Sequence, residues 1–245
     1  MNPTRSLVAR FALTAFEAAY VQPSHSLLSD MVRARKASLL DALRDVPRDA
    51  AILEVGCAFG GLLRAVLDAG YTNISGCDVD IKSLEKARAY VPEAGLALCT
   101  AENLAYGDES HDVVICAGVL NYLQNPEKSL AESQRVLRRD GILILSVGNA
   151  LSSGRAIVSW GRLIRMQPLR QRGYRYYTRR RAISMLRRAG FVPKQTSYFF
   201  HPLPFEYRWQ SNSQIGRRIA RLRNIFLHVL GSRWGNEFLI TARIR

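Results

Sequence analysis

The chain has 245 residues, of which 48% are hydrophobic, enough for one α/β domain with a sizeable buried core. It has no uncharged apolar run long enough to cross a membrane. Arg10 and Glu17 interrupt the apolar stretch 7–20, which argues against a cleaved signal peptide. The four cysteines form no CxxC pair and the histidines form no cluster, so we expect no metal site and a reducing compartment, the cytoplasm.

The basic charge lies almost entirely in the C-terminal part. Residues 1–150 have a net charge of −3, whereas residues 151–245 have +18, with 20 Lys and Arg against two acids, Glu206 and Glu237. An asymmetry of this size indicates anionic partners rather than a particular fold. Nearly all of these cations are arginines, whose planar fork suits phosphate and carboxylate groups. A GC-rich genome would equally favour arginine over lysine, but it would not explain why residues 151–245 contain so few acidic residues.

The first predicted element is a helix over residues 31–46, followed by short β-branched runs that alternate with helical patterns. Strands are predicted over residues 51–55, 73–78, 96–99, 112–117 and 141–147, and helices over 61–69, 81–90 and 126–137. This alternation indicates βαβ units in a doubly wound parallel sheet. The strands are nearly continuous apolar runs, as expected when helices cover both faces of the sheet.

The pattern changes after residue 147. A helix is predicted over residues 178–189, ending at Gly190, and strands are predicted over 191–199 and 237–244. A basic amphipathic helix is predicted over residues 214–230, because their apolar residues recur at spacings of three and four.

The strongest motif is ILEVGCAFGG at residues 52–61, which predicts a strand, a glycine-rich turn and the start of a helix. Glycine lets the backbone turn tightly and approach a ligand with no Cβ in the way. An ordinary strand–turn–helix connection would give the same pattern, so this motif alone does not settle the function.

A second motif follows one βα unit later, where ISGCD at residues 74–78 ends a predicted strand in an acid. An acid at this place accepts hydrogen bonds from the hydroxyl pair of a ribose. Asp78 could instead cap the next helix or lie solvated in the turn, but Asp80 is equally placed to serve as that cap.

Taken together, these residues resemble the class I S-adenosylmethionine-dependent methyltransferases. The family's first motif is acid-x-Gly-x-Gly-x-Gly, and this chain has Glu54, Gly56, Ala58 and Gly60, with Ala58 departing from the second glycine. Further similar segments follow in order: CTAENL at 99–104, SHDVVICAGVL at 110–120, residues 130–146, and RAGF at 188–191. The resemblance spans about residues 35–200 and adds residues 237–244 as a seventh strand.

The resemblance implies a mostly parallel seven-stranded sheet with helices on both faces and an antiparallel last strand. We expect a single methyltransferase domain over residues 1–245. Within it, residues 1–50 form a helical cap, 51–149 the cofactor-binding core, 150–180 and 201–235 basic, Arg-rich insertions facing the substrate, and 237–244 the last strand.

The resemblance also implies roles in holding S-adenosylmethionine. Glu54 and Gly56 would lie against its methionine end, and Asp78 would bind the ribose hydroxyls. The remaining implied cofactor residues are Cys57, Ala58 and Gly60 in the loop, Val79 against the adenine face, Ala101 and Glu102 at the adenine edge, and Ala117 beside the sulfonium. Arg35 is a further candidate, either for the methionine carboxylate or as a solvated helix charge.

Candidates for catalysis are few, because the sulfonium methyl is already activated and the protein mainly aligns the reacting atoms. A hydroxyl acceptor also has to lose a proton, usually to a nearby His, Glu or Asp. His25 and His201 flank segments that could cover the pocket, and Tyr122 follows the fourth strand at its carboxyl end, where it could contact the acceptor or merely pack. His111 would lie at the opposite end of the sheet, and His228 is expected to be structural.

Three kinds of acceptor remain open: a lipid-like molecule at an anionic membrane, an anionic sugar or glycan, and RNA. The amphipathic stripe 214–230 could also simply pack on the domain. We favour O-methylation of a small-molecule or lipid-like acceptor, as in the methyltransferases of quinone biosynthesis and glycan decoration, by a cytoplasmic enzyme that could be peripheral at the membrane. The sequence does not specify an oligomeric state. A non-catalytic protein that binds the cofactor or another nucleoside is the alternative outside enzymology.

Overall fold

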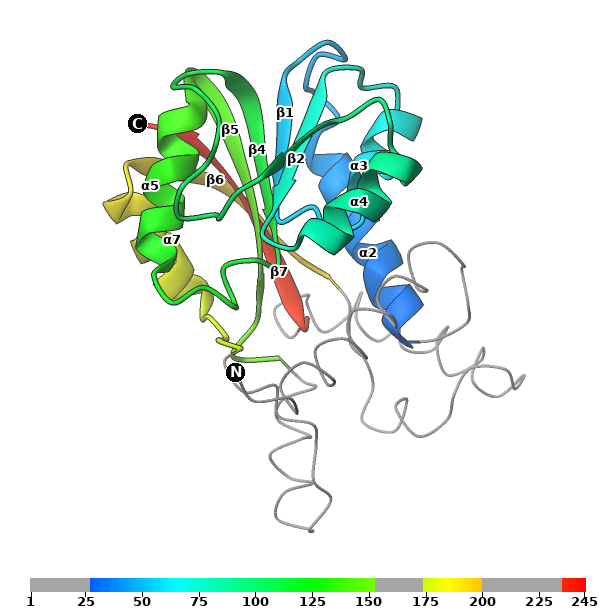
Figure 1. Ribbon diagram of the computed structural model, residues 1–245. Helices are drawn as coiled ribbons and strands as arrows, with labels where there is room; N and C mark the ends of the chain where they lie inside the picture. The colour runs from blue at the N-terminus through cyan, green and yellow to red at the C-terminus, as the bar shows by residue number, and fades with distance from the viewer. Residues whose placement is uncertain (1–26, 153–173, 200–234) are drawn as a thin grey trace, which may run out of the picture.

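The computed structural model describes residues 27–152, 174–199 and 235–245. Its centre is one seven-stranded sheet with the order β3-β2-β1-β4-β5-β7-β6 (Figure 1). The strands are β1 (Ile52–Val55), β2 (Ile74–Asp78), β3 (Gly95–Leu98), β4 (His111–Ala117), β5 (Leu137–Gly148), β6 (Phe191–Phe199) and β7 (Glu237–Ile244). The helices are α2 (Leu27–Ala42), α3 (Gly61–Asp68), α4 (Ile81–Tyr90), α5 (Pro126–Val136) and α7 (Arg179–Arg188).

The pairing of the strands confirms the predicted topology. Strands β1, β2, β3, β4 and β5 pair in parallel, whereas β7 lies antiparallel between β5 and β6. Because β2 and β4 flank β1 on opposite sides, the order of the strands reverses next to β1. In open α/β sheets, ligands bind outside the carboxyl ends of the strands at this point, so the loops after β1, β2 and β4 form the expected site.

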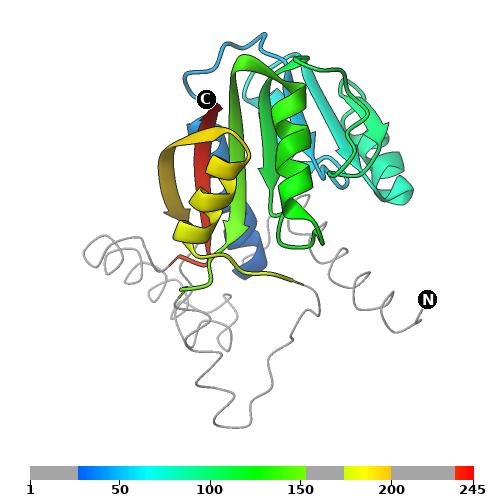
Figure 2. The same ribbon diagram turned by 90° about the vertical axis from the view of Figure 1, so that its left-hand side faces the viewer.

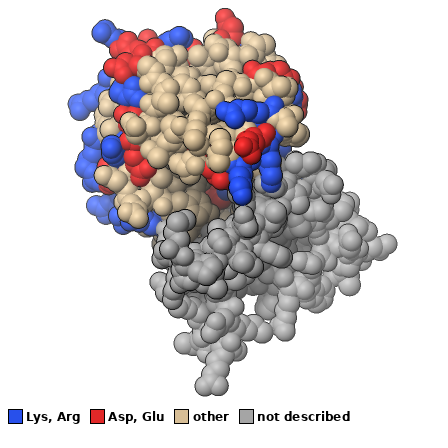
Figure 3. Space-filling model, viewed as in Figure 1, with Lys and Arg blue, Asp and Glu red and all other residues tan. Residues whose placement is uncertain are grey.

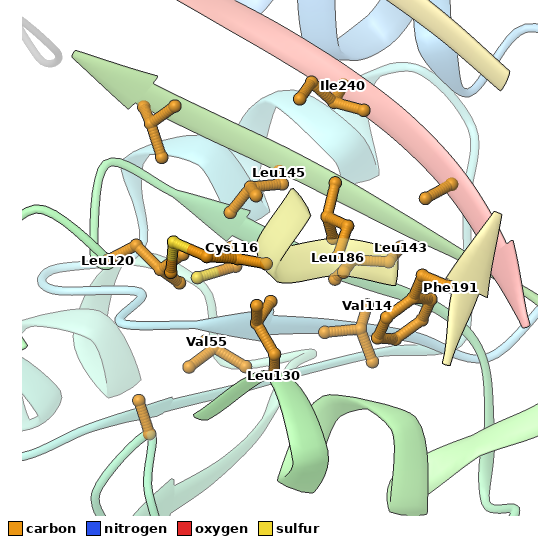
Figure 4. Close-up of a cluster of buried hydrophobic side chains, with 14 of the residues drawn as sticks. Val55, Val114, Cys116, Leu120, Leu130, Leu143, Leu145, Leu186, Phe191 and Ile240 are labelled. Carbon is orange, nitrogen blue, oxygen red and sulfur yellow. The ribbon is translucent and has the colours of Figure 1, made fainter. Parts of the chain in front are cut away.

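Helices cover both faces of the sheet, as the two views show (Figures 1 and 2). One face packs against α5 and α7, where Leu130 and Leu186 meet Val114 and Leu143 (Figure 4). The other face packs against α2, α3 and α4, and Leu39 of α2 is fully buried there. Alternate residues of each strand serve the two faces, so Glu54 and Asp78 both point towards the side of α2, α3 and α4.

Polar side chains fix where several of these helices begin. Asp80, one of the two acids that the sequence left open as the cap, accepts a hydrogen bond from the Ser83 amide at 3.2 Å and caps α4. Thr178 caps α7 in the same way. Side-chain caps of this kind satisfy amides that have no partner within the helix. With Asp80 serving as the cap, the Asp78 carboxylate is left for another role.

Two predicted boundaries were wrong. The helix predicted over residues 31–46 runs from Leu27 to Ala42 instead, and a turn follows it. The fifth strand begins at Leu137 rather than at residue 141, because Leu137 already pairs with His111 before the register shifts. The helix predicted over residues 214–230 lies outside the described residues.

Candidate cofactor and acceptor site

The glycine-rich loop after β1 is held against the end of β2. The amides of Gly56 and Cys57 both donate to the Cys77 carbonyl, at 2.7 and 2.9 Å. The loop turns through three residues with positive φ, namely Gly56 at 74°, Ala58 at 47° and Gly60 at 85°. This region of conformational space favours glycine, so the two glycines are required by the turn itself.

The space beside the two glycines is filled by protein rather than left to a ligand. A Cβ on Gly56 would lie 2.4 Å from Cγ2 of Val119, and a Cβ on Gly60 would lie 2.3 Å from Cγ2 of Val91. The first effect of a side chain on Gly56 would therefore be to push away Val119, two residues beyond the end of β4.

Asp78 ends β2 with its carboxylate held by backbone amides. Oδ2 accepts a hydrogen bond from the Ala58 amide at 2.9 Å, and Oδ1 accepts one from the Asp80 amide at 2.9 Å. Each carboxylate oxygen can accept a second hydrogen bond. The carboxylate is thus fixed against the glycine-rich loop, with acceptor capacity left for a pair of hydroxyl groups.

Glu54 is the unusual acid of the site. It is buried, with 5% of its surface exposed, and its Oε2 has no hydrogen-bond partner in the described part of the chain. Burial and the negative charge of Asp78 raise its pKa to about 8, against the opposing effect of Arg35. A buried carboxyl oxygen without a partner is costly, and an ammonium group such as that of the methionine end of the cofactor would satisfy it.

The remaining predicted cofactor residues lie at the same edge of the sheet. Val79 follows β2 and is 67% exposed, Ala101 and Glu102 follow β3, and Ala117 ends β4. Cys57 differs from the others, because its side chain is buried and packs 3.0 Å from the position of a Cβ on Gly76. It can therefore offer a ligand its backbone but not its thiol.

Sequence reasoning missed a buried ion pair between α2 and β7. The Arg35 guanidinium donates to both carboxylate oxygens of Glu237, through Nε at 3.0 Å and through its second nitrogen, and Ser146 donates to the same carboxylate at 3.1 Å. Arg35 is 7% exposed and Glu237 5% exposed, so Arg35 is not a solvated helix charge. One of its nitrogens lies 3.6 Å from the position of a Cβ on Gly118, just after β4. The only available signal was that Glu237 is one of two acids after residue 150.

The structure places Tyr122 at the carboxyl end of β4, exposed and in edge contact with Tyr174 at 4.9 Å between ring centroids. His111 begins β4 at the opposite edge and is bonded to Ser75 and Ser110, as expected of a structural histidine. His25 and His201, the other candidates for a catalytic base, lie outside the described residues. Within the described part of the chain, no group of acids, cysteines and histidines could hold a metal ion, and no helix is long and apolar enough to span a membrane.

Comparison with known proteins agrees with this geometry. A family model described as "Methyltransferase domain" matches residues 53–145. A ubiquinone biosynthesis O-methyltransferase of Haemophilus ducreyi is 28% identical over 185 residues, covering 70% of this chain and 78% of that protein. The enzyme of the same name from a Ruegeria species is 27% identical over 177 residues, covering 67% and 71%.

Solved structures show the same fold. An S-adenosylmethionine-dependent methyltransferase of Thermotoga maritima superposes with a TM-score of 0.62 at 18% identity, covering 87% of this chain and 91% of that one. A magnesium protoporphyrin IX methyltransferase of Synechocystis, solved with bound S-adenosylhomocysteine, gives 0.62 at 14% identity, covering 89% and 87%. The family model, the similar sequences and the fold agree, and the chain therefore belongs to the class I S-adenosylmethionine-dependent methyltransferases.

Proposed function

We propose that the chain transfers the methyl group of S-adenosylmethionine to an oxygen atom of a small-molecule acceptor. The observation that carries this proposal is the pairing of two acids at neighbouring strand ends. Glu54 presents a buried oxygen without a partner among the described residues, and Asp78 presents a carboxylate fixed by two amides. The two acids end neighbouring strands, and the charge of Asp78 acts on Glu54, so both could meet the amino group and the ribose hydroxyls of a single ligand.

In this proposal the cofactor site is completed by the loop at residues 56–60 and by Val79, Ala101, Glu102 and Ala117. When bound, S-adenosylmethionine would supply an activated methyl group for the acceptor oxygen and leave as S-adenosylhomocysteine. The residues of the chain align the two molecules, which is the larger part of catalysis for a leaving group this good. We assign most of residues 51–149 to the cofactor, and we assign Tyr122 and the chain beyond residue 149 to the acceptor.

The proposal of an oxygen acceptor is supported by the names of the similar proteins, which are O-methyltransferases. The family assignment favours catalysis over a non-catalytic binding protein. The free thiols of all four cysteines support a reducing compartment. A lipid-like acceptor taken from an anionic membrane surface, and an anionic glycan, both suit the basic C-terminal part.

Titration calorimetry with S-adenosylhomocysteine tests the cofactor site. Asp78→Ala should weaken binding by roughly 1–3 kcal/mol, the scale of a lost charged hydrogen bond. Asp80→Ala is the matched control, because it removes a neighbouring acid that caps α4; it should lower stability by about 1 kcal/mol and leave the affinity unchanged. Equal affinities for Asp78→Ala and the wild type would place the ribose elsewhere, and no binding by the wild type would refute the proposed function.

RNA remains a second candidate acceptor, favoured by one observation. The described residues 174–199 contain six arginines and one lysine and no acid. By contrast, Figure 3 shows Lys and Arg interspersed with Asp and Glu on the described part of the face seen in Figure 1, which does not suit a long polyanion. Transfer of labelled methyl groups to total RNA, at low and high salt, would separate an RNA acceptor from a small one, because binding to a polyanion weakens steeply with salt.

A further inference from the structure

A chain of contacts leads from the cofactor loop to a cluster of three tyrosines. Val119 packs against Gly56 in the loop, and three residues later Tyr122 meets Tyr174 edge to face. Tyr174 in turn meets Tyr176, with ring centroids 4.7 Å apart. The tyrosine cluster (Tyr122, Tyr174 and Tyr176) therefore adjoins the loop that faces the methionine end of the cofactor in the proposed function.

Hydrogen bonds fasten the segment carrying Tyr174 and Tyr176 to the ends of two strands. The Arg175 amide donates to the Asn121 carbonyl at 2.7 Å, and the fully buried Asn121 side chain returns a bond to the Arg175 carbonyl. The same side chain accepts from the Gly148 amide at 3.3 Å. Tyr177 adds a bond from its hydroxyl to the Leu120 carbonyl at 3.2 Å and one from its amide to the Gly148 carbonyl at 2.9 Å. The tyrosine cluster is thus held on a rigid base.

Gly148, at the end of β5, makes room for the rings. A Cβ there would lie 2.8 Å from the hydroxyl of Tyr174 and 3.1 Å from Cδ1 of Tyr176. The absence of a side chain at this position allows two rings to lie directly over the strand end. Glycine at such a position often marks a close approach to the backbone. Here it lets the two tyrosine rings pack tightly on the end of β5, as side chains that shape a ligand site need to do.

The outer two rings are partly exposed. Tyr122 is 59% exposed and Tyr176 is 42% exposed. Burial together with the Glu237 carboxylate raises the pKa of Tyr174. The Tyr174 hydroxyl therefore stays protonated at neutral pH, so its ring suits a contact surface and not a proton acceptor.

Charge decides between the two kinds of ligand that aromatic clusters bind. Aromatic rings pack against other planar rings, and they also hold alkylammonium groups. The buried Arg35–Glu237 pair carries no net charge, whereas the exposed Arg175 lies between Tyr174 and Tyr176 in the chain. The Arg181 guanidinium lies 5.8 Å from the ring centroid of the neighbouring Tyr177. These cations disfavour an ammonium-bearing acceptor and favour a neutral or anionic one.

We propose that Tyr122, Tyr174 and Tyr176 form the specificity wall of the acceptor site, and that this wall takes a planar ring carrying no positive charge. This inference rests on the proposed function, because it places the wall beside the cofactor's methyl group. The wall selects by shape and charge.

Three probes test the wall in the complex with S-adenosylhomocysteine: 3,4-dihydroxybenzoate, its benzylamine analogue, which reverses the charge, and its saturated cyclohexane analogue, which removes the planar ring. Calorimetry should show the benzoate binding at least about tenfold more tightly than either analogue. Tyr122→Ala should weaken benzoate binding about tenfold, and Tyr122→Phe should restore it to within about threefold. Neither variant should change the affinity for S-adenosylhomocysteine.

Tyr90→Ala is the matched control, because Tyr90 is a partly exposed tyrosine at the end of α4 and is not part of the tyrosine cluster. It should bind both ligands as the wild type does. Tighter binding of the benzylamine or of the saturated ring, or equal benzoate affinity in wild type and Tyr122→Ala, would overturn the wall while leaving the cofactor site intact. Loss of S-adenosylhomocysteine binding by the wild type would instead refute the proposed function itself.

Discussion

The two halves of the site are built in different ways. On the cofactor side, the joining contacts are made by backbone amides over short separations, and Ala58 and Asp78 are 20 residues apart. On the acceptor side, side chains join distant parts of the chain. Arg35 and Glu237 are 202 residues apart, and Asn121 and Arg175 are 54 apart. The cofactor side is encoded in a local sequence motif, whereas the acceptor side forms only when distant segments have come together in the folded sheet.

This difference gives the two halves different vulnerabilities. A backbone-built site tolerates most side-chain changes but fails where a glycine gains a Cβ. A site that depends on a buried ion pair fails when either partner is removed, because the remaining charge is left without compensation. The following predictions test that contrast.

The largest effect is expected from breaking the Arg35–Glu237 pair. Arg35→Met leaves the Glu237 carboxylate buried without its cation, which should lower the free energy of unfolding by about 3–5 kcal/mol. Adding Glu237→Leu to the same chain removes that uncompensated charge and should recover most of the loss. Urea denaturation followed by circular dichroism measures both variants.

The exposed Arg44–Asp41 pair provides the control, since its side chains are 71% and 62% exposed. Arg44→Met should change stability by less than about 1 kcal/mol. If Arg35→Met cost no more than Arg44→Met, the acceptor side would not depend on its buried pair, and the contrast between the two halves would fail.

The limits of sequence reasoning follow the same division. The turn at 56–60, the acid that ends β2 and the doubly wound, mostly parallel sheet could be predicted, because each is indicated by residues close in the sequence with a recognisable spacing. The role of Glu237 could not, since nothing near it in the sequence indicates Arg35. The start of β5 at Leu137 was missed for a similar reason, because it depends on pairing with His111 across the sheet.

On the cofactor side, Gly56→Val should abolish measurable binding of S-adenosylhomocysteine, a loss of at least about a hundredfold, or about 3 kcal/mol. The new Cβ would meet Val119 at 2.4 Å, and a branched residue would be strained at φ 74°. Gly70→Val is the matched control: Gly70 also has positive φ, at 90°, but a Cβ there meets nothing within 4 Å. Gly70→Val should lower the free energy of unfolding without changing the affinity for S-adenosylhomocysteine. If calorimetry found that Gly56→Val also binds normally, the loop assignment would be refuted.

The raised pKa of Glu54 predicts that cofactor affinity depends on pH, whereas acceptor affinity should not. With its pKa raised to about 8, Glu54 is mostly protonated at pH 7, and binding an ammonium group requires the ionised form. Affinity for S-adenosylhomocysteine should therefore rise about fivefold between pH 7 and 8, or about 1 kcal/mol, with a proton released on binding. Calorimetry in buffers of different ionisation enthalpy measures that proton.

The free energy of unfolding of the cofactor-free protein should fall with rising pH, whereas the affinity for S-adenosylhomocysteine should rise. Because the folded pKa of Glu54 lies above its unfolded value, the stabilising effect of the bound proton is present at low pH and is lost as pH rises through about 8.

Glu54→Gln should make the affinity for S-adenosylhomocysteine independent of pH between pH 7 and 8. A wild-type affinity that is already flat between pH 7 and 8 would mean that Glu54 does not meet the ammonium group.

The smallest effect is expected at Ala58, where the chain departs from the family's second glycine. Its φ of 47° is left-handed and costs an alanine about 1 kcal/mol, of which part is offset by the greater freedom of glycine in the unfolded chain. Ala58→Gly should therefore stabilise the protein by about 0.5 kcal/mol. Affinity for S-adenosylhomocysteine should stay within about twofold, because the amide that donates to Asp78 is retained. Glu109→Gly relieves a similar φ of 49° away from the loop and should give a similar gain. If Ala58→Gly alone lowered the affinity, the methyl group of Ala58 would be a direct cofactor contact, and the loop would not act through its backbone alone.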